Sequence, residues 1–268
     1  MQSSFVMLKH TQLKLNKLNN VKMNKDTLRE ENDIILKPIG LVNSPYKEKF
    51  AIPRQPGLVS AAKGTIELLN DANCIDSIRG LEQFSHIWLL FVFHGTQDQG
   101  WKPLVKPPRL GGNKKIGVLA TRSTFRPNPI GMSVVKLDKT EVISHNIILH
   151  ISGMDLLDKT PIIDIKPYVP YSDALPNARA GFAQTQPQIN RNIIFPDNVN
   201  QTIDNLSTEL PDLKQLIEQV LAQDPRPAYK QNKLDEKVYG MHLYNLNIQW
   251  QVQDIETIEV IQITVLPY

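Results

Sequence analysis

Short apolar runs rich in β-branched residues recur along the first two thirds of the chain, and each run predicts a strand. These runs lie at residues 34–42, 63–69, 87–94, 115–119, 132–135, 142–152 and 161–168. The run at 87–94 is apolar almost throughout, so we expect a strand buried on both faces. Residues 76–84 instead have helical spacing. Strand after strand with few helices favours a mainly β fold with a closed or strongly curved sheet over a βαβ arrangement.

The pattern changes in the last third of the chain. Residues 176–200 are rich in proline, asparagine and glutamine and predict a linker. Apolar residues between 206 and 221 then follow helical spacing, and two strand-like runs lie at 241–248 and 258–265. We therefore expect four parts: a disordered or weakly helical extension, a β-barrel domain, a linker and a small C-terminal α+β domain. Their predicted bounds are 1–33, 34–175, 176–200 and 201–268.

The connection at residues 121–131 differs from an ordinary turn between strands. It carries Arg122 and Arg126, and Asn128 stands between two prolines. Proline fixes φ and holds the preceding residue extended, so the loop should be stiff. Guanidinium groups bind phosphate and carboxylate bidentately and stack on flat rings. The loop therefore predicts an anionic, planar ligand, although a surface hairpin with incidental arginines would have the same composition.

Two further connections are stiffened by proline. Residues 52–57 end in Gln55-Pro56-Gly57 and form a second candidate ligand loop, although a plain connection between strands is the commoner case. Residues 224–229 read Asp-Pro-Arg-Pro-Ala-Tyr and hold Arg226 between two prolines. Both parts of the chain with predicted strands thus present an arginine on a rigid loop.

Charge is unevenly distributed. The formal net charge is +3, and residues 1–33 contribute +2 of it through six basic and four acidic residues. Residues 99–137 hold eight basic residues and no acidic one. Such a block is a candidate phosphate-binding surface, and a solvated positive face is the alternative. Its loop at 95–115 is too long for a mere connection.

Several classes of protein are excluded. The single cysteine, Cys74, permits neither an intrachain disulfide nor a thiolate zinc cluster, and it fits a reducing, intracellular compartment. No apolar run approaches the roughly 18–20 residues that cross a membrane, and the N-terminus lacks a secretory signal. The glycine spacing of a Rossmann turn or a P-loop is also missing. We predict no metal site.

Four segments together resemble one family. The stretch at 121–131, with residues 84–88, 156–161 and 164–168, is similar to the TsaA/TrmO family. The motif at 224–229 and the C-terminal part resemble the bacterial TrmO branch. The resemblance runs from about residue 34 to the end of the chain. Lys159 stands where the family often has glycine.

The resemblance implies a single-sheeted β-barrel that binds S-adenosylmethionine and is not a Rossmann sheet. It implies a methyltransferase acting on N6 of threonylcarbamoyladenosine, next to the anticodon of tRNA. The partners implied are the tRNA anticodon stem-loop and a second copy of the chain in a cytoplasmic homodimer. The alternatives are a methyltransferase for another acceptor and an S-adenosylmethionine-binding sensor or RNA-binding protein without methyl transfer.

The resemblance also assigns residues. The cofactor positions are Gln55, Pro56, Gly57, Phe93, His94, Arg122, Met132, Ser152, Gly153, Met154 and Asp155. The acceptor side takes Arg126, Asn128, Asp224, Arg226 and Tyr229. Arg126 and Arg226 are candidates for the substrate carboxylate, Asn128 for a base or carbamoyl edge, and Tyr229 for stacking on unstacked bases. His94 and Asp155 are the candidate proton acceptors, and neither is preferred.

Overall fold

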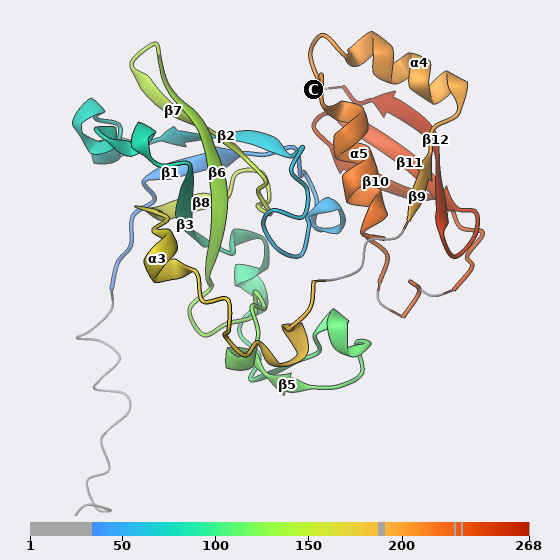
Figure 1. The fold of residues 1–268 in the computed structure, drawn as a ribbon, viewed down its shortest axis with the longest axis horizontal. Helices are drawn as coiled ribbons and strands as arrows, with labels where there is room; N and C mark the ends of the chain where they lie inside the picture. The colour runs from blue at the N-terminus through green and yellow to red at the C-terminus, as the bar shows by residue number, and fades with distance from the viewer. Residues whose placement is uncertain (1–33, 187–190, 228, 232, 268) are drawn as a thin grey trace, which may run out of the picture. The chain divides into compact units, whose positions relative to one another are not determined.

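Six strands close into an antiparallel barrel in the computed structural model of the chain, which describes residues 34–186, 191–227, 229–231 and 233–267. The strands are β1 (Gly40–Asn43), β2 (Lys63–Leu68), β3 (His86–Val92), β6 (Ile130–Ile143), β7 (Asn146–Ser152) and β8 (Pro161–Pro167). Their order around the barrel is β1-β2-β7-β6-β3-β8 (Figure 1). The predicted mainly β fold with a closed sheet is confirmed. The expected extension at 1–33 lies outside the described residues.

Alternation along the strands fills the barrel. On β6, buried and more exposed residues alternate from Ile130 to Asp138, and β3 alternates in the same way. The prediction that 87–94 is buried on both faces is wrong, because a barrel strand turns only one face to the core. Trp88 points to the other face, where its indole Nε1 donates to Asp173 Oδ2 over 2.8 Å.

Several predicted elements are shorter than expected. The first strand begins at Gly40 rather than at residue 34. The helix expected at 76–84 is two 3₁₀ turns, η3 (Ile75–Ile78) and η4 (Leu81–Gln83), because Gly80 between them has a φ of 88°. The run at 142–152 is divided by a turn between β6 and β7, where Ser144 and His145 have positive φ.

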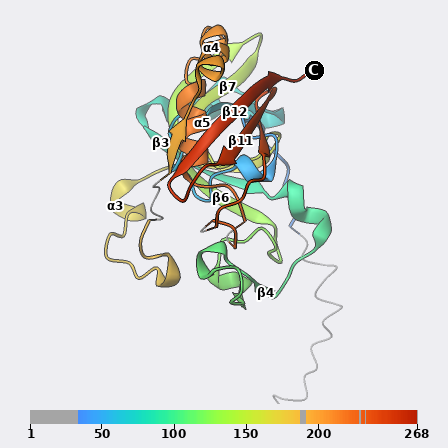
Figure 2. The same ribbon diagram turned by 90° about the vertical axis from the view of Figure 1, so that its right-hand side faces the viewer.

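The basic loop at 95–115 has structure of its own. It contains the 3₁₀ turns η5 (His94–Gln99) and η6 (Pro108–Leu110) and the strand β4 (Leu104–Val105). β4, labelled in Figure 2, pairs with β5 (Ile116–Gly117). The strand expected at 115–119 is therefore limited to these two residues, and the turn η7 (Val118–Ala120) follows them. The short turns elsewhere are η1 (Lys49–Ala51), η2 (Asn70–Ala72), α3 (Pro170–Asp173) and η8 (Gly181–Ala183).

The C-terminal part is a four-stranded sheet with two helices. Its strand order is β10-β11-β12-β9, with bounds Tyr239–Leu243, Leu246–Val252, Thr257–Val265 and Asn192–Ile194. The helices α4 (Asp197–Leu206) and α5 (Leu213–Ala222) pack against this sheet (Figure 1). β9 and the start of α4 fall in the range expected to be a linker. We therefore propose that this part begins before residue 192.

The connection between β1 and β2 joins the barrel to the C-terminal sheet. Tyr46 is fully buried and forms a β-bridge with Leu243 at the end of β10. The Tyr244 N–H donates to the Pro45 carbonyl over 2.7 Å, and the His242 N–H donates to Glu48 Oε1 over 3.0 Å. We call these contacts between residues 44–50 and 241–244 the seam. They place both parts on one continuous hydrophobic core.

None of the helices in the described ranges combines the length and the apolar character that a membrane crossing requires.

A glycine on β2 tests the packing of the barrel. A Cβ at Gly64 would overlap the Asn43 carbonyl oxygen and the methyl group of buried Met154. We expect Gly64→Ala to lower the free energy of unfolding by roughly 1–3 kcal/mol, because a packed core adjusts poorly to added volume. Denaturant unfolding measures the change. Gly117→Ala is the matched control, since a Cβ there meets open space, and equal losses in both variants would contradict the packing argument.

Candidate functional site

A cavity of about 510 Å³ lies where several loops meet the ends of β3 and β6. Its wall is formed by Lys49, residues 52–55, 91–96, 121–122, 124–126, 130–133 and 155–157, and Thr160. Phe91 and Phe93 stack edge to face on one side, with ring centroids 5.1 Å apart. Gly131 lies directly opposite Phe91 on β6, and a Cβ there would overlap both rings. The glycine that closes the arginine loop thus makes room for an aromatic wall.

The arginine loop is held by its own hydrogen bonds. Arg126 Nη1 donates to the carbonyls of Thr121 over 2.6 Å and of Val118 over 3.3 Å. Thr121 Oγ1 donates to the Val118 carbonyl and accepts from the Ser123 N–H. Lys102 adds a cation–π contact, 4.2 Å from the centroid of the Phe125 ring. The loop is therefore stiff, as expected, and part of the Arg126 guanidinium serves the loop itself.

Arg122 connects two of the predicted ligand loops. Its Nη1 donates to Gln55 Oε1 over 2.7 Å, so the loops at 52–57 and 121–131 meet at the rim of the cavity. The basic side chains lining the cavity are Lys49, Arg54, Arg122 and Arg126. Among the described residues on this wall, Asp155 is the one acidic group. The positive potential of the rim favours an anionic ligand group.

The carboxyl group of Asp155 is unusual. Burial raises its pKa to about 6, even though a hydrogen bond from Ser133 Oγ, its own backbone N–H and the charge of Arg122 all act to lower it. Burial wins because removing a carboxylate from water costs more than these contacts return. A carboxyl group with this pKa is mostly ionised at neutral pH, and it can attract a cation or take up a proton.

The predicted cofactor residues divide into two groups. Gln55, Phe93, His94, Arg122, Met132 and Asp155 line the cavity, as does Arg126 from the acceptor side. Pro56, Gly57, Ser152, Gly153 and Met154 are not part of its wall. They support it, because the Gly57 N–H donates to the Gly153 carbonyl over 2.8 Å and Met154 is fully buried. Asn128 is exposed on the loop and also stands outside the wall.

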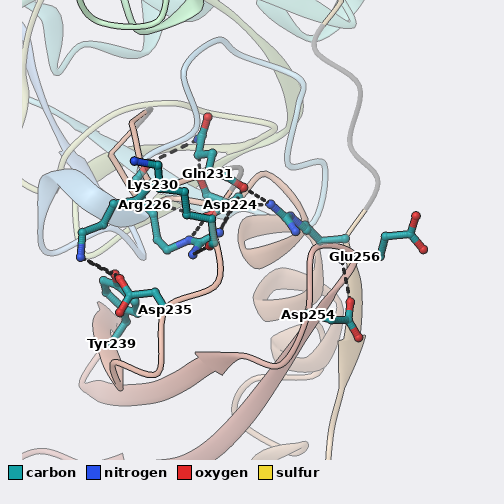
Figure 3. A network of polar contacts seen from close by, with 10 residues as sticks. Asp224, Arg226, Lys230, Gln231, Asp235, Tyr239, Asp254 and Glu256 are labelled. Carbon is teal, nitrogen blue, oxygen red and sulfur yellow. Dashed lines mark hydrogen bonds and ion pairs between the residues drawn. The ribbon is translucent and has the colours of Figure 1, made fainter.

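The residues of the 224–229 motif lie in the C-terminal part, outside this cavity. Arg226 is 2% exposed, and its Nε and Nη2 bind Asp224 Oδ1 and Oδ2 over 2.8 and 2.7 Å (Figure 3). Its Nη1 and Nη2 also donate to the carbonyls of Lys233 and Gln231. Arg191 Nη2 approaches the same Asp224 carboxylate to 2.9 Å. The guanidinium of Arg226 thus fastens its own loop, and its contact with a substrate carboxylate stays a prediction.

Four residues of this arrangement are absent from the predicted set. Ser133 is a serine at an inward-facing position of β6, which was a readable signal in the alternating pattern. Arg54 stands within a loop that was already a candidate. Lys49 and Arg191 gave no signal in the sequence. Only the fold brings Lys49 to the cavity and Arg191 to Asp224.

Lys159, where the family often has glycine, has a φ of 59°, in the left-handed region that glycine adopts without strain.

Within the described ranges, no group of three or more histidine, cysteine or acidic side chains is arranged to hold a metal ion.

Fold and cavity together define a class. The protein contains a closed β-barrel, not a doubly wound sheet, and its loops enclose a pocket lined by aromatic rings and by charged side chains of both signs. Comparison with models of protein families identifies the family. The tRNA-methyltransferase O N-terminal domain model matches residues 41–174, and the TrmO C-terminal domain model matches residues 188–266. The chain belongs to the tRNA-methyltransferase O family.

Individual relatives agree. A tRNA (adenine(37)-N6)-methyltransferase of Escherichia coli (strain K12) is 50% identical over 81% of this chain and 92% of its own length. A putative S-adenosylmethionine-dependent methyltransferase RcsF of Pseudomonas aeruginosa is 45% identical over 84% of this chain and 96% of its own. A crystal structure of TrmO from Pseudomonas aeruginosa superposes with a TM-score of 0.72 at 39% identity, covering 87% of this chain and 100% of that one.

The raised pKa of Asp155 predicts a pH-dependent stability. The folded protein keeps the Asp155 proton up to a pKa of about 6, whereas the unfolded chain releases it near the ordinary aspartate pKa of 3.8. This contribution to stability is therefore complete below about pH 4 and is lost as the pH rises through 6. We expect Asp155→Asn to lack this loss. The free energy of unfolding of the variant, relative to that of the wild type, should therefore rise by roughly 1–3 kcal/mol between about pH 4 and pH 7.

Denaturant unfolding across this range measures the difference, and it is extended to lower pH for the control. Asp158→Asn is the control of opposite sign. Burial acts to raise the pKa of Asp158, but the hydrogen bonds from Lys47 and from the Ser44 N–H and the nearby lysine charges overcome it, and the pKa is lowered. Its contribution is present at neutral pH and is lost as the pH falls through the lowered pKa. Parallel profiles for Asp155→Asn and the wild type would refute the buried-carboxyl interpretation.

Proposed function

We propose that the protein uses S-adenosylmethionine to methylate N6 of adenosine 37 in tRNA, where that adenosine carries a threonylcarbamoyl group. The observation that carries the proposal is the cavity, which combines a buried carboxyl group, an aromatic wall and a basic rim in a barrel of this family. The Escherichia coli relative, a tRNA (adenine(37)-N6)-methyltransferase, supports the tRNA position. The threonylcarbamoyl group rests on the resemblance of residues 121–131 and 224–229 to the family.

The cavity fits the cofactor by size and by chemistry. A volume of about 510 Å³ lies within the range of small-molecule sites. Asp155 would hold a positively charged group of the ligand, Arg122 its carboxylate, and the Phe93 ring either the adenine or the cation. S-adenosylmethionine supplies a methyl group on a positively charged sulfonium.

The acceptor nitrogen belongs to a ureido group, so its lone pair is delocalised and the nitrogen is a weak nucleophile. Most of the rate gain must then come from alignment of the two reacting atoms, which a stiff loop provides. Arg126 faces the cavity and is placed to bind the carboxylate of the substrate while its Nη1 holds the loop. Asn128, exposed beside it, is available to an edge of the base.

A proton leaves the acceptor nitrogen during the reaction. Of the described side chains on the cavity wall, His94 and Asp155 are the two candidate proton acceptors. Asp155, with its pKa raised to about 6, is matched to this task when ionised. We therefore place proton acceptance at one of these two groups.

The anticodon stem would lie along the basic loop. Lys102, Lys106, Arg109, Lys114 and Lys115 are all exposed on the segment that carries β4 and β5. Exposed cations at this density bind phosphates through counterion release, so binding should weaken steeply with salt.

We also propose a cytoplasmic homodimer, as the resemblance implies. The apolar side chains of Ile130 and Met132 support it, because they are exposed at the start of β6, beside the cavity. The molar mass in solution, measured by light scattering, decides between one and two copies.

Mass spectrometry of tRNA nucleosides tests the function. The purified protein is incubated with S-adenosylmethionine and with tRNA that carries threonylcarbamoyladenosine. We expect that nucleoside to gain one methyl group, and tRNA without the threonylcarbamoyl group to remain unmodified. Cofactor binding with no methyl transfer would instead support a sensor, and transfer to unmodified tRNA would overturn the proposed acceptor.

The substitution of Arg226 tests whether the barrel and the C-terminal part have different roles in catalysis and in cofactor binding. We expect Arg226→Ala to lower kcat/KM by roughly 10- to 100-fold, because the 224–231 loop loses its anchor and a buried carboxylate loses a partner. The affinity for S-adenosylmethionine, measured by calorimetry, should stay unchanged, since Arg226 lies outside the first cavity. Arg79→Ala, at an exposed ion pair, is the control. An equal loss of cofactor affinity would contradict this division of roles.

A further inference from the structure

A second cavity, of about 330 Å³, lies beside the 224–229 loop. Four aromatic residues line it: Phe50 from η1, Tyr229 from the loop, Tyr239 from β10 and Trp250 from β11. Lys230 and Lys237 complete its charged wall. Aromatic faces interleaved with ammonium groups are typical of sites that bind single-stranded nucleic acid.

The inner wall of this second cavity is preformed. The rings of Tyr239 and Trp250 stack with centroids 4.8 Å apart and an angle of 21° between their planes. Trp250 is 2% exposed, and its indole N–H finds no hydrogen-bond partner among the described residues. A buried donor without a partner is costly, so an acceptor atom of a ligand at this wall would relieve that cost.

The outer wall consists of exposed aromatic rings. Phe50 is 63% exposed and Tyr229 is 67% exposed, although both border a cavity. Lys237 Nζ lies 5.3 Å from the centroid of the Tyr239 ring, and Lys230 Nζ lies 5.7 Å from it. Lys230 also binds Asp235 over 2.7 Å (Figure 3). Exposed rings in a cavity that is also lined by two lysines offer a stacking surface for a base and a contact for its phosphate.

The two cavities are neighbours. Lys49 lines the first cavity and Phe50 lines the second, and these residues are consecutive in η1. Consecutive Cα atoms are about 3.8 Å apart, so at this point only one peptide bond lies between the residues that line the two cavities. The carboxylate of Asp224 also reaches across electrostatically, because it acts on the pKa of Arg54 against the larger, lowering effect of partial burial. The two cavities therefore lie close together on either side of η1.

We propose that the second cavity receives an unstacked base of the tRNA loop, one neighbouring the acceptor adenosine. This inference rests on the proposed function and deepens it. The acceptor must leave the stack of the loop to reach the first cavity, and its neighbour then loses a stacking partner. The rings of Phe50 and Tyr229 replace that partner. The second cavity therefore holds the strand in register while the acceptor is methylated.

A double-mutant cycle between protein and RNA tests the inference. The probes are an anticodon stem-loop RNA and two versions in which the nucleotide before or after the acceptor adenosine is abasic. We expect Tyr229→Ala and Phe50→Ala each to weaken binding of the intact RNA by about 5- to 100-fold. One of the two abasic RNAs should bind the wild type more weakly by a similar factor. That abasic RNA should lose little further affinity when Tyr229 or Phe50 is replaced.

Tyr171→Ala is the matched control, because Tyr171 is a 92% exposed tyrosine that lines neither cavity. It should bind every probe as the wild type does. Unchanged binding of the intact RNA by both cavity variants would overturn the inference, and so would losses that add independently to those of the abasic RNAs. Cofactor binding by each variant shows that the fold is kept.

The same samples separate this inference from the proposed function. If the wild type methylates tRNA while the cycle shows independent losses, only the base site fails. If the wild type transfers no methyl group to tRNA, the proposed function fails, whatever the cycle shows.

Discussion

The connection between β1 and β2 must satisfy two sheets at once, and the rest of the molecule depends on how it does so. Tyr46 is fully buried at the seam, and the neighbouring backbone pairs with the end of β10. Main-chain hydrogen bonds in a buried environment cannot be exchanged for water, so they fix the position of this connection. The same connection supplies Lys49 to one cavity and Phe50 to the other. The same segment of chain thus joins the barrel to the C-terminal sheet and contributes a residue to each of the two cavities.

Buried charge is handled differently at the two sites. Asp155 stands in the first cavity with a single hydroxyl donor and the charge of Arg122, and its pKa rises to about 6. Asp224 is bound by two arginines, so it acts as a fixed counter-ion that shapes a loop. A weakly compensated carboxyl group can respond to a ligand or to a proton. The carboxylate of Asp224, held between two guanidinium groups, fixes the geometry of its loop instead.

Sequence reasoning found the loops of the first cavity more reliably than the role of each side chain. Proline and glycine spacing is local, so it identified the stiff loops at 52–57 and 121–131. The alternation that should have revealed Ser133 was also local, but a single serine in an apolar strand is a weak signal. Arg126 and Arg226 were both expected to face a substrate. The structure shows that each first binds carbonyls of its own loop, which no spacing rule reports.

By itself, the sequence determined the family, the mainly β class and the rigid arginine-bearing loops, because these follow from neighbours along the chain. Only the tertiary structure decided which loops share a cavity. Arg122 meets Gln55 across 67 positions, and Arg191 meets Asp224 across 33. Contacts between such distant residues depend on barrel closure and on the seam, which are set by packing of the whole core. The burial that raises the pKa of Asp155 has the same origin, since solvent exposure is a property of the fold.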